Sequence, residues 1–241
     1  MKVLVVGGGS GGHITPAMSV IRELLEHYPA TQVEFWTDRK YYKNILNLAN
    51  EIAVSWGDEE TVSRKNKQYI RVRRVFSGKF RRYHGLKLKD YFDDGAKTFC
   101  SVVFGNLVGM LGFGLGLIQT FGRLVISQKR PDVIFLKGGF VGLPVGLVAG
   151  ILKIPYVLHE SDAVFGLTNR ILMKKAAKIA TGVPVETEKY APEIAEKIEY
   201  YTTYGDILLH LSKMNFSLYK AVAQELTKNP SDQARLNIKE L

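Results

Sequence analysis

The sequence predicts an α/β fold built on a Rossmann-like, doubly wound parallel sheet, and three observations lead to this prediction. Short apolar, β-branched segments alternate with longer segments of helical periodicity along the chain. Such alternation is typical of a parallel sheet with helices on both faces. Glycine-rich loops follow two predicted strands, and ligands of such sheets bind beyond the carboxyl ends of the strands. At 241 residues, the chain can bury a substantial core.

The predicted strands are short runs of apolar and β-branched residues. They cover residues 2–6, 32–36, 52–56, 69–75, 132–136, 155–158, 178–181 and 198–201. The predicted helices fill most of the gaps and cover residues 16–27, 41–48, about 90–128, 143–152 and 167–177. After Val185 the sequence becomes charged, and apolar residues recur at helical spacing between residues 206 and 228. We therefore expect a domain over residues 1–185 and a charged, helical tail over residues 186–241.

The basic residues are concentrated in one segment of the chain. The whole chain has a net charge of +10, and the segment between Thr61 and Lys89 is rich in Lys and Arg and lacks Asp and Glu. Its basic residues are Arg64, Lys65, Lys67, Arg71, Arg73, Arg74, Lys79, Arg81, Arg82, Lys87 and Lys89. The rest of the chain is close to neutral, so this segment must face an anionic partner or water.

An uncharged segment follows the basic one and covers residues 98–122. It is long enough to span a bilayer, which takes about 20 apolar residues. However, Asn106 and Gln119 interrupt it, and its glycines lower helix propensity in water. Three interpretations stay open: a buried pair of core helices, a helix or hairpin on the membrane surface beside the basic residues, and a transmembrane span.

A glycine-rich loop follows the first predicted strand and opens a helix. It reads Gly7-Gly8-Gly9-Ser10-Gly11-Gly12-His13, and Thr15 and Pro16 suit the N-cap and the first helical position. Glycines let a backbone approach a ligand closely. The N-terminus of a helix attracts anions such as phosphate. The loop is therefore a candidate phosphate site.

The same loop satisfies the dinucleotide pattern Gly7-x-Gly9-x-x-Gly12, and Asp38 after the second strand is the candidate ribose ligand. This pattern is weak evidence by itself. The histidine directly after the last glycine and a second glycine-rich loop both argue against a nicotinamide or flavin enzyme. A purely structural turn is also disfavoured, because so many glycines are costly without a ligand to approach.

Polar groups follow two further predicted strands. Lys137-Gly138-Gly139-Phe140 ends one strand and opens a helix, so it forms a second cradle that suits a pyrophosphate if it faces the first. His159-Glu160-Ser161-Asp162 follows the strand at 155–158, and Gly166-Leu167-Thr168-Asn169 starts the next helix. Polar groups at the carboxyl end of a strand are placed to contact a ligand.

These motifs, in this order and spacing, resemble those of the MurG family. Its members are the UDP-N-acetylglucosamine:undecaprenyl-pyrophosphoryl-muramyl-pentapeptide N-acetylglucosaminyltransferases of peptidoglycan synthesis. The short Ser77-Gly78-Lys79 segment is also similar to a Ser-Gly element of that family, and the resemblance covers about residues 1–185. Asp162 is a departure, because the family commonly has Asn at this position.

The resemblance implies the glycosyltransferase B fold, in which an N-terminal Rossmann-like domain binds the lipid acceptor and a C-terminal one binds the UDP-sugar. Residues 1–185 would be the acceptor-binding domain, with a membrane-associating segment at about 64–122. Residues 186–241 would be a remnant or the start of the donor domain. The family's Gly-Asn-Pro-x-Arg linker motif and the donor domain's own glycine loop are absent from this sequence.

The resemblance also assigns roles to individual residues. His13 is the candidate general base that takes a proton from the acceptor hydroxyl, a task that suits a histidine near neutral pKa, and Glu160 is a second candidate catalytic residue. The candidate substrate-binding residues are Ser10, Gly11, Gly12, Gly138, Gly139, Phe140, Asp162 and Asn169. The candidate membrane-contacting residues are Arg73, Arg74, Lys79, Arg81, Arg82, Phe104, Leu107 and Phe113. We expect neither a cofactor nor a metal.

The expected function is inverting transfer of N-acetylglucosamine from UDP-N-acetylglucosamine to a lipid-pyrophosphate-linked muramyl-peptide acceptor. Anionic lipids and a separate donor-binding subunit are further expected partners. The single Cys100 and the absence of a signal peptide indicate the cytoplasm, so we expect the cytoplasmic face of the cell membrane.

Three alternatives to this function are retained. One is the acceptor subunit of a split glycosyltransferase for another polyprenyl-linked glycan. The second is a non-catalytic module that binds lipid pyrophosphates. Nucleic-acid binding by the basic segment is the third, since aromatic residues are interleaved there, but the neighbouring apolar segment favours lipid.

Overall fold

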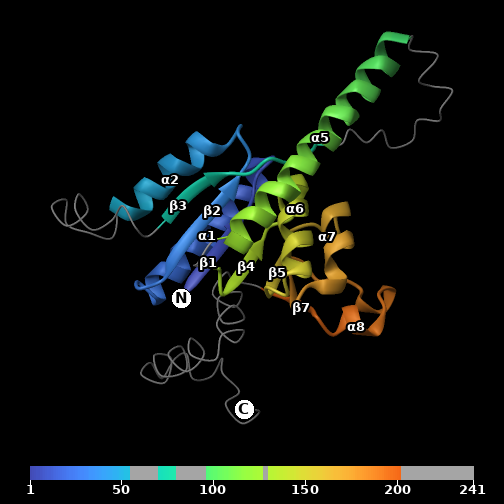
Figure 1. Ribbon diagram of the computed structural model, residues 1–241. Coiled ribbons are helices and arrows are strands. Elements are labelled where there is room, and N and C mark those ends of the chain that lie inside the picture. Colours follow the sequence, from blue (N-terminus) through green and yellow to red (C-terminus); the bar gives the residue numbers. More distant parts are fainter. Residues whose placement is uncertain (55–69, 80–95, 127–129, 202–241) are drawn as a thin grey trace.

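The computed structural model describes residues 1–54, 70–79, 96–126 and 130–201, and within them it contains one parallel sheet of seven strands (Figure 1). The strand order is β3-β2-β1-β4-β5-β6-β7. The strands are β1 (Lys2–Val6), β2 (Gln32–Thr37), β3 (Ile70–Arg74), β4 (Val133–Leu136), β5 (Tyr156–Glu160), β6 (Lys178–Thr181) and β7 (Ile198–Tyr200). The predicted fold class is confirmed.

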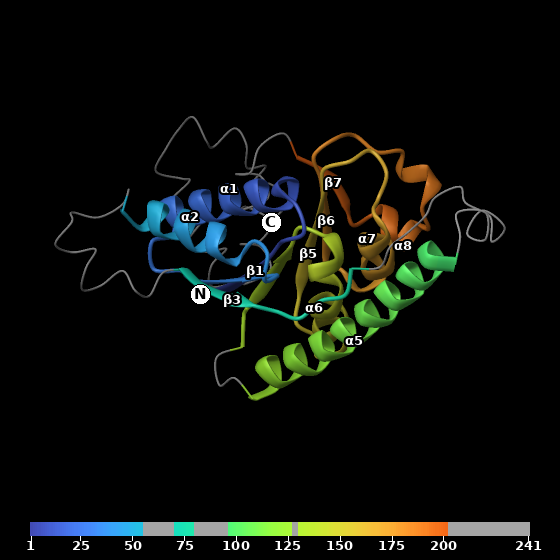
Figure 2. The ribbon, with the colours of Figure 1, turned by 90° about the horizontal axis from the view of Figure 1, so that it is seen from above.

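Helices cover both faces of the sheet. They are α1 (Gly11–His27), α2 (Tyr42–Val54), α5 (Ala96–Ile126), α6 (Gly139–Ile151), α7 (Leu167–Leu172) and α8 (Pro192–Ala195), with 3₁₀ turns η2 (Met173–Lys175) and η3 (Thr187–Lys189). Seen from above, α1 and α2 lie on one face, and α5 and α6 lie on the other (Figure 2). Val3 and Val5 pack in the first layer, and Leu4 and Val6 in the second, because successive side chains of a strand point to opposite faces.

The register of the central strands brings the predicted loops to one edge of the sheet. Val6 at the end of β1 pairs with Leu136 at the end of β4, and Leu136 pairs with Leu158 in β5. The amide of Lys137 then donates to the carbonyl of Val6 at 3.0 Å. The loops that carry the motifs therefore begin side by side.

The predicted strand at 52–56 is wrong where the structure describes it. Residues 52–54 belong to α2, and Ile45, Ala49 and Ile52 are all buried. This spacing of four and then three residues puts the three side chains on one face of a helix, against the sheet. Burial of that face outweighs the β propensity of the isoleucine and valine.

The predicted start of the first helix is also wrong. Helix α1 begins at Gly11, with Ser10 as an extended N-cap residue, and Pro16 lies inside the helix. Proline there gives up the hydrogen bond to the carbonyl of Gly12, four residues earlier. The helix therefore begins inside the glycine loop, which places His13 in its first turn.

The sheet continues past residue 185, where we expected the domain to end. Strand β7 pairs in parallel with β6, and Thr181 lies opposite Tyr200. The turns η3 and α8 connect the two strands, and Ile194 of α8 is buried in the core. The described part of the tail thus adds an edge strand to the sheet.

The uncharged segment forms part of one continuous helix, α5, rather than a hairpin or a buried pair of helices. Figure 1 shows its N-terminal turns projecting beyond the body of the molecule. By length and composition, residues 103–126 could cross a membrane, and 17% of the most apolar stretch is buried. The exposed apolar side chains of α5 are Val103, Phe104, Leu107, Val108, Met110, Leu111, Leu115, Ile118, Phe121, Val125 and Ile126.

Glycines explain how α5 packs on the sheet layer. The helix lies so close to the segment 76–78 that a Cβ on Gly116 would overlap the carbonyl oxygen of Phe76. A Cβ on Gly78 would likewise overlap the carbonyl oxygen of Gly109. The glycines that weaken this helix in isolation are therefore needed where it meets the backbone of another segment.

Candidate functional site

An open cleft of about 370 Å³ lies at the carboxyl ends of β1, β4 and β5. Most of the predicted acceptor-site residues line it: Ser10, His13, Gly138, Gly139, Phe140, Glu160, Asp162 and Asn169. Gly11 and Gly12 do not line it, because they lie on the exposed side of the first turn of α1. Segments more than a hundred residues apart in the sequence thus converge on one site.

Sequence reasoning missed two cations of this cleft. Lys137 lines it and is 2% exposed, and Lys79, which we assigned to the membrane, also lines it. The position of Lys137 directly before two glycines was the available signal for the first. Lys79 ends the Ser-Gly element noted above, but nothing local places that element at the cleft, because it comes from the segment after β3.

The first glycine loop is held by Asp38. Its carboxylate accepts hydrogen bonds from the amides of Gly9 at 2.6 Å, Lys40 at 2.7 Å and Tyr41 at 3.1 Å. Asp38 is 8% exposed. These three amides hold the buried carboxylate in place, so in this structure Asp38 shapes the loop. This geometry counts further against the dinucleotide interpretation.

The two glycine loops face each other. A Cβ on Gly9 would lie 2.6 Å from the ring of Phe140, and a Cβ on Gly139 would lie 3.3 Å from Nε2 of His13. Both glycines have φ values in the left-handed region, +83° and +71°. Glycine is therefore required at both positions, for space and for backbone conformation.

The N-termini of α1 and α6 both begin at this cleft. Neither helix has an acidic residue in its first turn, and no side chain caps either one at Ser10 or Gly138. Uncapped amides at the start of a helix, together with the helix dipole, bind anions. The two starts form a paired cradle of the kind that suits a pyrophosphate.

His13 is oriented by the backbone of the second loop. Its Nδ1 lies 3.3 Å from the carbonyl oxygen of Lys137. Because a carbonyl can only accept, Nδ1 carries the proton in the neutral ring and Nε2 keeps its lone pair. Burial lowers the pKa of His13, and the charge of Lys137 lowers it further, against the opposing effects of this hydrogen bond and of Glu160 and Asp162. Near neutral pH, His13 is therefore a neutral base with Nε2 available.

Glu160 is buried and holds the third loop in shape. Oε1 accepts from the amides of Ser161 at 3.0 Å and Asp162 at 3.3 Å. Oε2 accepts from the amide of Gly166 at 2.9 Å and from Nδ2 of Asn169 at 3.0 Å. These four donors stabilise the carboxylate. The geometry fits a positioning role better than proton transfer.

Asn169 presents an acceptor that no protein group in the described chain satisfies. It is 2% exposed, and Nδ2 donates to the carbonyl of His159 at 3.2 Å as well as to Glu160. Two acceptors on this atom identify it as the nitrogen, so the opposite atom is Oδ1. Oδ1 is buried without a hydrogen-bond partner beside Gly138 in the cleft wall. A ligand hydroxyl or amide N–H would satisfy it.

Among the predicted membrane residues that the structure describes, only Lys79 lines the cleft. Phe104 and Leu107 are exposed on α5, whereas Phe113 is half-buried near Gly78. Arg81 and Arg82 lie outside the described residues. The other two, Arg73 and Arg74, are on β3, in a cluster with residues of α5.

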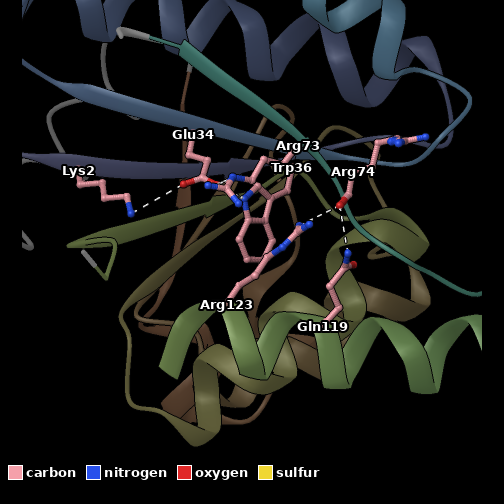
Figure 3. Close-up of polar contacts among 7 residues, drawn as sticks. All are labelled: Lys2, Glu34, Trp36, Arg73, Arg74, Gln119 and Arg123. Carbon is pink, nitrogen blue, oxygen red and sulfur yellow. Dashed lines mark hydrogen bonds and ion pairs between the residues drawn. The ribbon is translucent and has the colours of Figure 1, made fainter. Parts of the chain in front are cut away.

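Figure 3 shows this cluster, in which Arg123 and Gln119 of α5 reach toward β2 and β3. The guanidinium of Arg123 lies over the ring of Trp36 at 5.2 Å and donates to the carbonyl of Arg74 at 2.8 Å. Arg73 pairs with Glu34 at 2.5 Å. These contacts fix the C-terminal half of α5 across the sheet.

Two adjoining cavities of about 450 and 650 Å³ open beside this cluster and share Arg73, Gln119 and Arg123. Their cationic lining residues are Lys2, Arg39, Arg71, Arg73, Arg74 and Arg123, and Glu34 is the one carboxylate among the lining residues. Ile118 and Ile126 form part of the lining and are 72% and 81% exposed. The cationic cavities therefore open onto the apolar face of α5.

Comparisons with known proteins identify the family that this chain is similar to. Residues 84–181 match the glycosyltransferase family 28 N-terminal domain. A protein of Lachnospira eligens is 33% identical over 192 residues, which are 80% of this chain and 43% of that protein. A protein of Bacillus cereus is 34% identical over 200 residues, 83% of this chain and 44% of that protein. Both carry the name UDP-N-acetylglucosamine–N-acetylmuramyl-(pentapeptide) pyrophosphoryl-undecaprenol N-acetylglucosamine transferase, the second with the number 2.

A solved structure shows the same fold. The crystal structure of MurG from Acinetobacter baumannii matches with a TM-score of 0.52 and 19% sequence identity. The match covers 83% of this chain and 45% of that chain. The chain therefore spans less than half the length of the relatives that it matches.

Proposed function

The chain carries the N-terminal domain of glycosyltransferase family 28, and we propose that this domain binds the acceptor for N-acetylglucosamine transfer from UDP-N-acetylglucosamine. The acceptor would be a lipid-pyrophosphate-linked muramyl peptide of peptidoglycan synthesis. The observation that carries the proposal is the neutral His13, whose Nε2 faces a cleft between two helix N-termini. Such a cleft supplies a base and an anion cradle at one place.

The chemistry needs one displacement at the anomeric carbon of the donor. The acceptor hydroxyl attacks this carbon, a new glycosidic bond forms, and the bond to the UDP phosphate breaks. Nε2 of His13 takes the hydroxyl proton, and UDP leaves with the bonding electron pair. The configuration inverts, and no covalent enzyme intermediate is needed. Glu160 keeps the third loop in place, and Oδ1 of Asn169 accepts a hydrogen bond from the acceptor.

The cleft supports an acceptor with a pyrophosphate rather than a nucleotide cofactor. Phosphate groups would lie between the starts of α1 and α6, with the ammonium of Lys137 beside them. The UDP-sugar would bind a second domain across the cleft, which either belongs to a longer protein or comes from a partner subunit. The acceptor subunit of a split glycosyltransferase for another polyprenyl-linked glycan remains the second candidate, because the same cleft serves both.

A transfer assay with the donor half supplied tests the proposal. The part of the Lachnospira eligens relative that this chain does not match is added as a separate protein or fused to the chain. Labelled N-acetylglucosamine should pass from its UDP donor to an undecaprenyl-pyrophosphoryl muramyl-peptide only when both halves are present. Transfer by this chain alone would refute the need for a second half. If the chain bound the acceptor but neither the mixed nor the fused halves transferred sugar, a non-catalytic lipid-pyrophosphate module would be favoured.

We further propose that the protein works peripherally on the cytoplasmic face of the cell membrane. The apolar face of α5 and the cationic cavities beside β3 adjoin, which is the arrangement of surfaces that bind anionic bilayers. Phe104 and Leu107 would enter the interface, and Arg73 and Arg74 would meet headgroups. In a cell, such an enzyme would supply wall precursor for growth, shape and division.

Vesicle flotation tests this location. Vesicles with an anionic lipid should carry the protein at low salt, and neutral vesicles should carry much less of it. High salt should weaken the binding, because the electrostatic part is screened within about 8–10 Å. Equal flotation with anionic and neutral vesicles would contradict the proposed contact of the arginines with anionic headgroups. If nucleic acid competed with vesicles for the protein, the alternative of nucleic-acid binding by the basic segment would be supported.

A further inference from the structure

Lys137 connects three segments of the cleft. Its carbonyl oxygen accepts from Nδ1 of His13 at 3.3 Å, and its Nζ donates to Oγ of Ser161 at 2.7 Å. Its own amide donates to the carbonyl of Val6 at 3.0 Å. The residue is 2% exposed and directly precedes Gly138, the N-cap residue of α6. Lys137 is therefore fixed in place at the base of the candidate acceptor site.

The charge of this ammonium is poorly compensated by the protein. No carboxylate lies within 4.0 Å of it in the part of the chain that the structure describes. Glu160 is the carboxylate with the larger electrostatic effect on Lys137, but four N–H donors already occupy its oxygens. Burial lowers the pKa of Lys137, against Glu160 and Asp162. A buried cation in a cleft of this kind favours an anionic ligand.

The same ammonium also acts on His13. Burial, first, and the charge of Lys137, second, lower the pKa of the imidazole. The groups that oppose this effect are the carbonyl of Lys137 and the carboxylates of Glu160 and Asp162. His159 also interacts electrostatically with His13, and Lys79 is a further cation that lines the cleft. Any anion that neutralises Lys137 therefore changes the balance of charges around His13.

We propose that Lys137 couples occupation of the cleft by a phosphate-bearing ligand to the basicity of His13. In the empty cleft the ammonium disfavours the imidazolium. A diphosphate bound against Lys137 and the two helix N-termini compensates that charge and adds negative charge beside the ring. His13 then becomes a stronger base only when the ligand is present. No covalent bond changes in this step. The identity of the ligand as the acceptor's pyrophosphate rests on the proposed function.

The test measures the pKa of the His13 ring by NMR on the full chain, with and without inorganic pyrophosphate. A His13→Gln variant assigns the resonance among the five histidines. Lys137→Met removes the charge and keeps most of the length of the side chain, and Lys43→Met on the exposed face of α2 is the matched control. If the methionine variant does not fold, Lys137→Gln replaces it.

Pyrophosphate should raise the pKa of His13 in the wild-type protein by about one pH unit, as a nearby opposite charge does. Lys137→Met should raise it by about half a unit to one unit without any ligand, and should weaken pyrophosphate binding about tenfold. Lys43→Met should match the wild type. An unchanged His13 pKa in Lys137→Met, or no response of the wild type to pyrophosphate, would overturn the coupling.

The coupling and the proposed function can fail separately. Pyrophosphate could shift the pKa of His13 while the two-part protein transfers no sugar. This result would support the coupling and refute the proposed transferase function. Sugar transfer without a change in the pKa of His13 would support the transferase function and overturn the coupling. In that case, Lys137 would only hold Ser161 and the third loop in place.

Discussion

The cleft and the apolar face of α5 use glycine and charge in opposite ways. In the cleft, glycines bring two loops together. Buried carboxylates such as Asp38 and Glu160 accept hydrogen bonds from backbone amides, which fixes these charges within the fold. On α5, glycines bring a helix onto a neighbouring segment, and the apolar side chains of its outer face stay in solvent. The cleft is thus shaped for one ligand, whereas the α5 face suits an extended surface.

The largest expected effect concerns the base in the cleft. His13→Ala should lower kcat for transfer by about 10²–10⁴-fold in the two-part assay, because general-base help is lost. His27→Ala, in the last turn of the same helix, should leave kcat unchanged. If His13→Ala kept full activity, His13 would not be the general base, and the cleft would be left with a binding role at this residue.

The packing of α5 gives the next largest effect. Gly116→Ala forces a Cβ onto the carbonyl oxygen of Phe76, so it should lower the free energy of unfolding by about 3 kcal/mol. Gly114→Ala is the matched control, since no atom lies within 4 Å of its added Cβ. It should stabilise the protein by about 0.5–1 kcal/mol through helix propensity. Urea unfolding measures both, and equal values would show that α5 does not dock as described.

The carboxylate of the third loop gives a smaller effect. Glu160→Gln places an amide group against the donors of Gly166 and Asn169 and should destabilise the protein by about 2 kcal/mol. Glu26→Gln, exposed on α1, should change stability by less than about 0.5 kcal/mol. If Glu160→Gln changed the stability little but lowered kcat tenfold, a catalytic role for Glu160 would be supported instead.

The histidine behind the cleft predicts the pH dependence of stability. Burial lowers the pKa of His159 to about 3, and its side chain is 3% exposed. Between its ordinary value of 6.5 and about 3, the unfolded chain binds a proton that the folded chain does not. The stability is therefore complete above pH 6.5 and falls as the pH decreases, by about 1.4 kcal/mol per pH unit.

Urea unfolding at pH 7, 6 and 5 measures this slope. His159→Leu should remove most of it, and the wild-type slope should persist in His27→Ala. A slope that is the same in His159→Leu would assign the acid sensitivity to other groups.

The smallest expected effect concerns the cationic cavities. Arg71→Gln, on β3, should weaken binding to anionic vesicles by about 1 kcal/mol at low salt, because each basic residue near the surface contributes about that amount. Arg22→Gln, exposed on α1 and therefore on the other face of the sheet, should have no effect. Co-sedimentation with vesicles measures both. Equal losses would show a response to net charge rather than to this surface.

The sequence predicted much of the fold, because the signals it uses are local. Strand periodicity located most strands within one or two residues, and the glycine loops and the His-Glu segment identified the edge of the sheet where the cleft lies. The strand at 52–56 failed because the helical spacing of Ile45, Ala49 and Ile52 meets a buried surface supplied by the sheet. Local β propensity contains no information about that surface.

The site shows the same division between local and tertiary information. The sequence by itself determined which loops meet at the cleft, since alternating strands and helices put the carboxyl ends of parallel strands at one edge. Only the tertiary structure decided that Gly11 and Gly12 do not line the cleft, that Lys79 and Lys137 do, and that one face of α5 stays exposed. The reason is physical: burial, hydrogen-bond partners and electrostatic neighbours come from segments far apart in the chain. His13 is the clearest case, because the carbonyl that orients it lies 124 residues away.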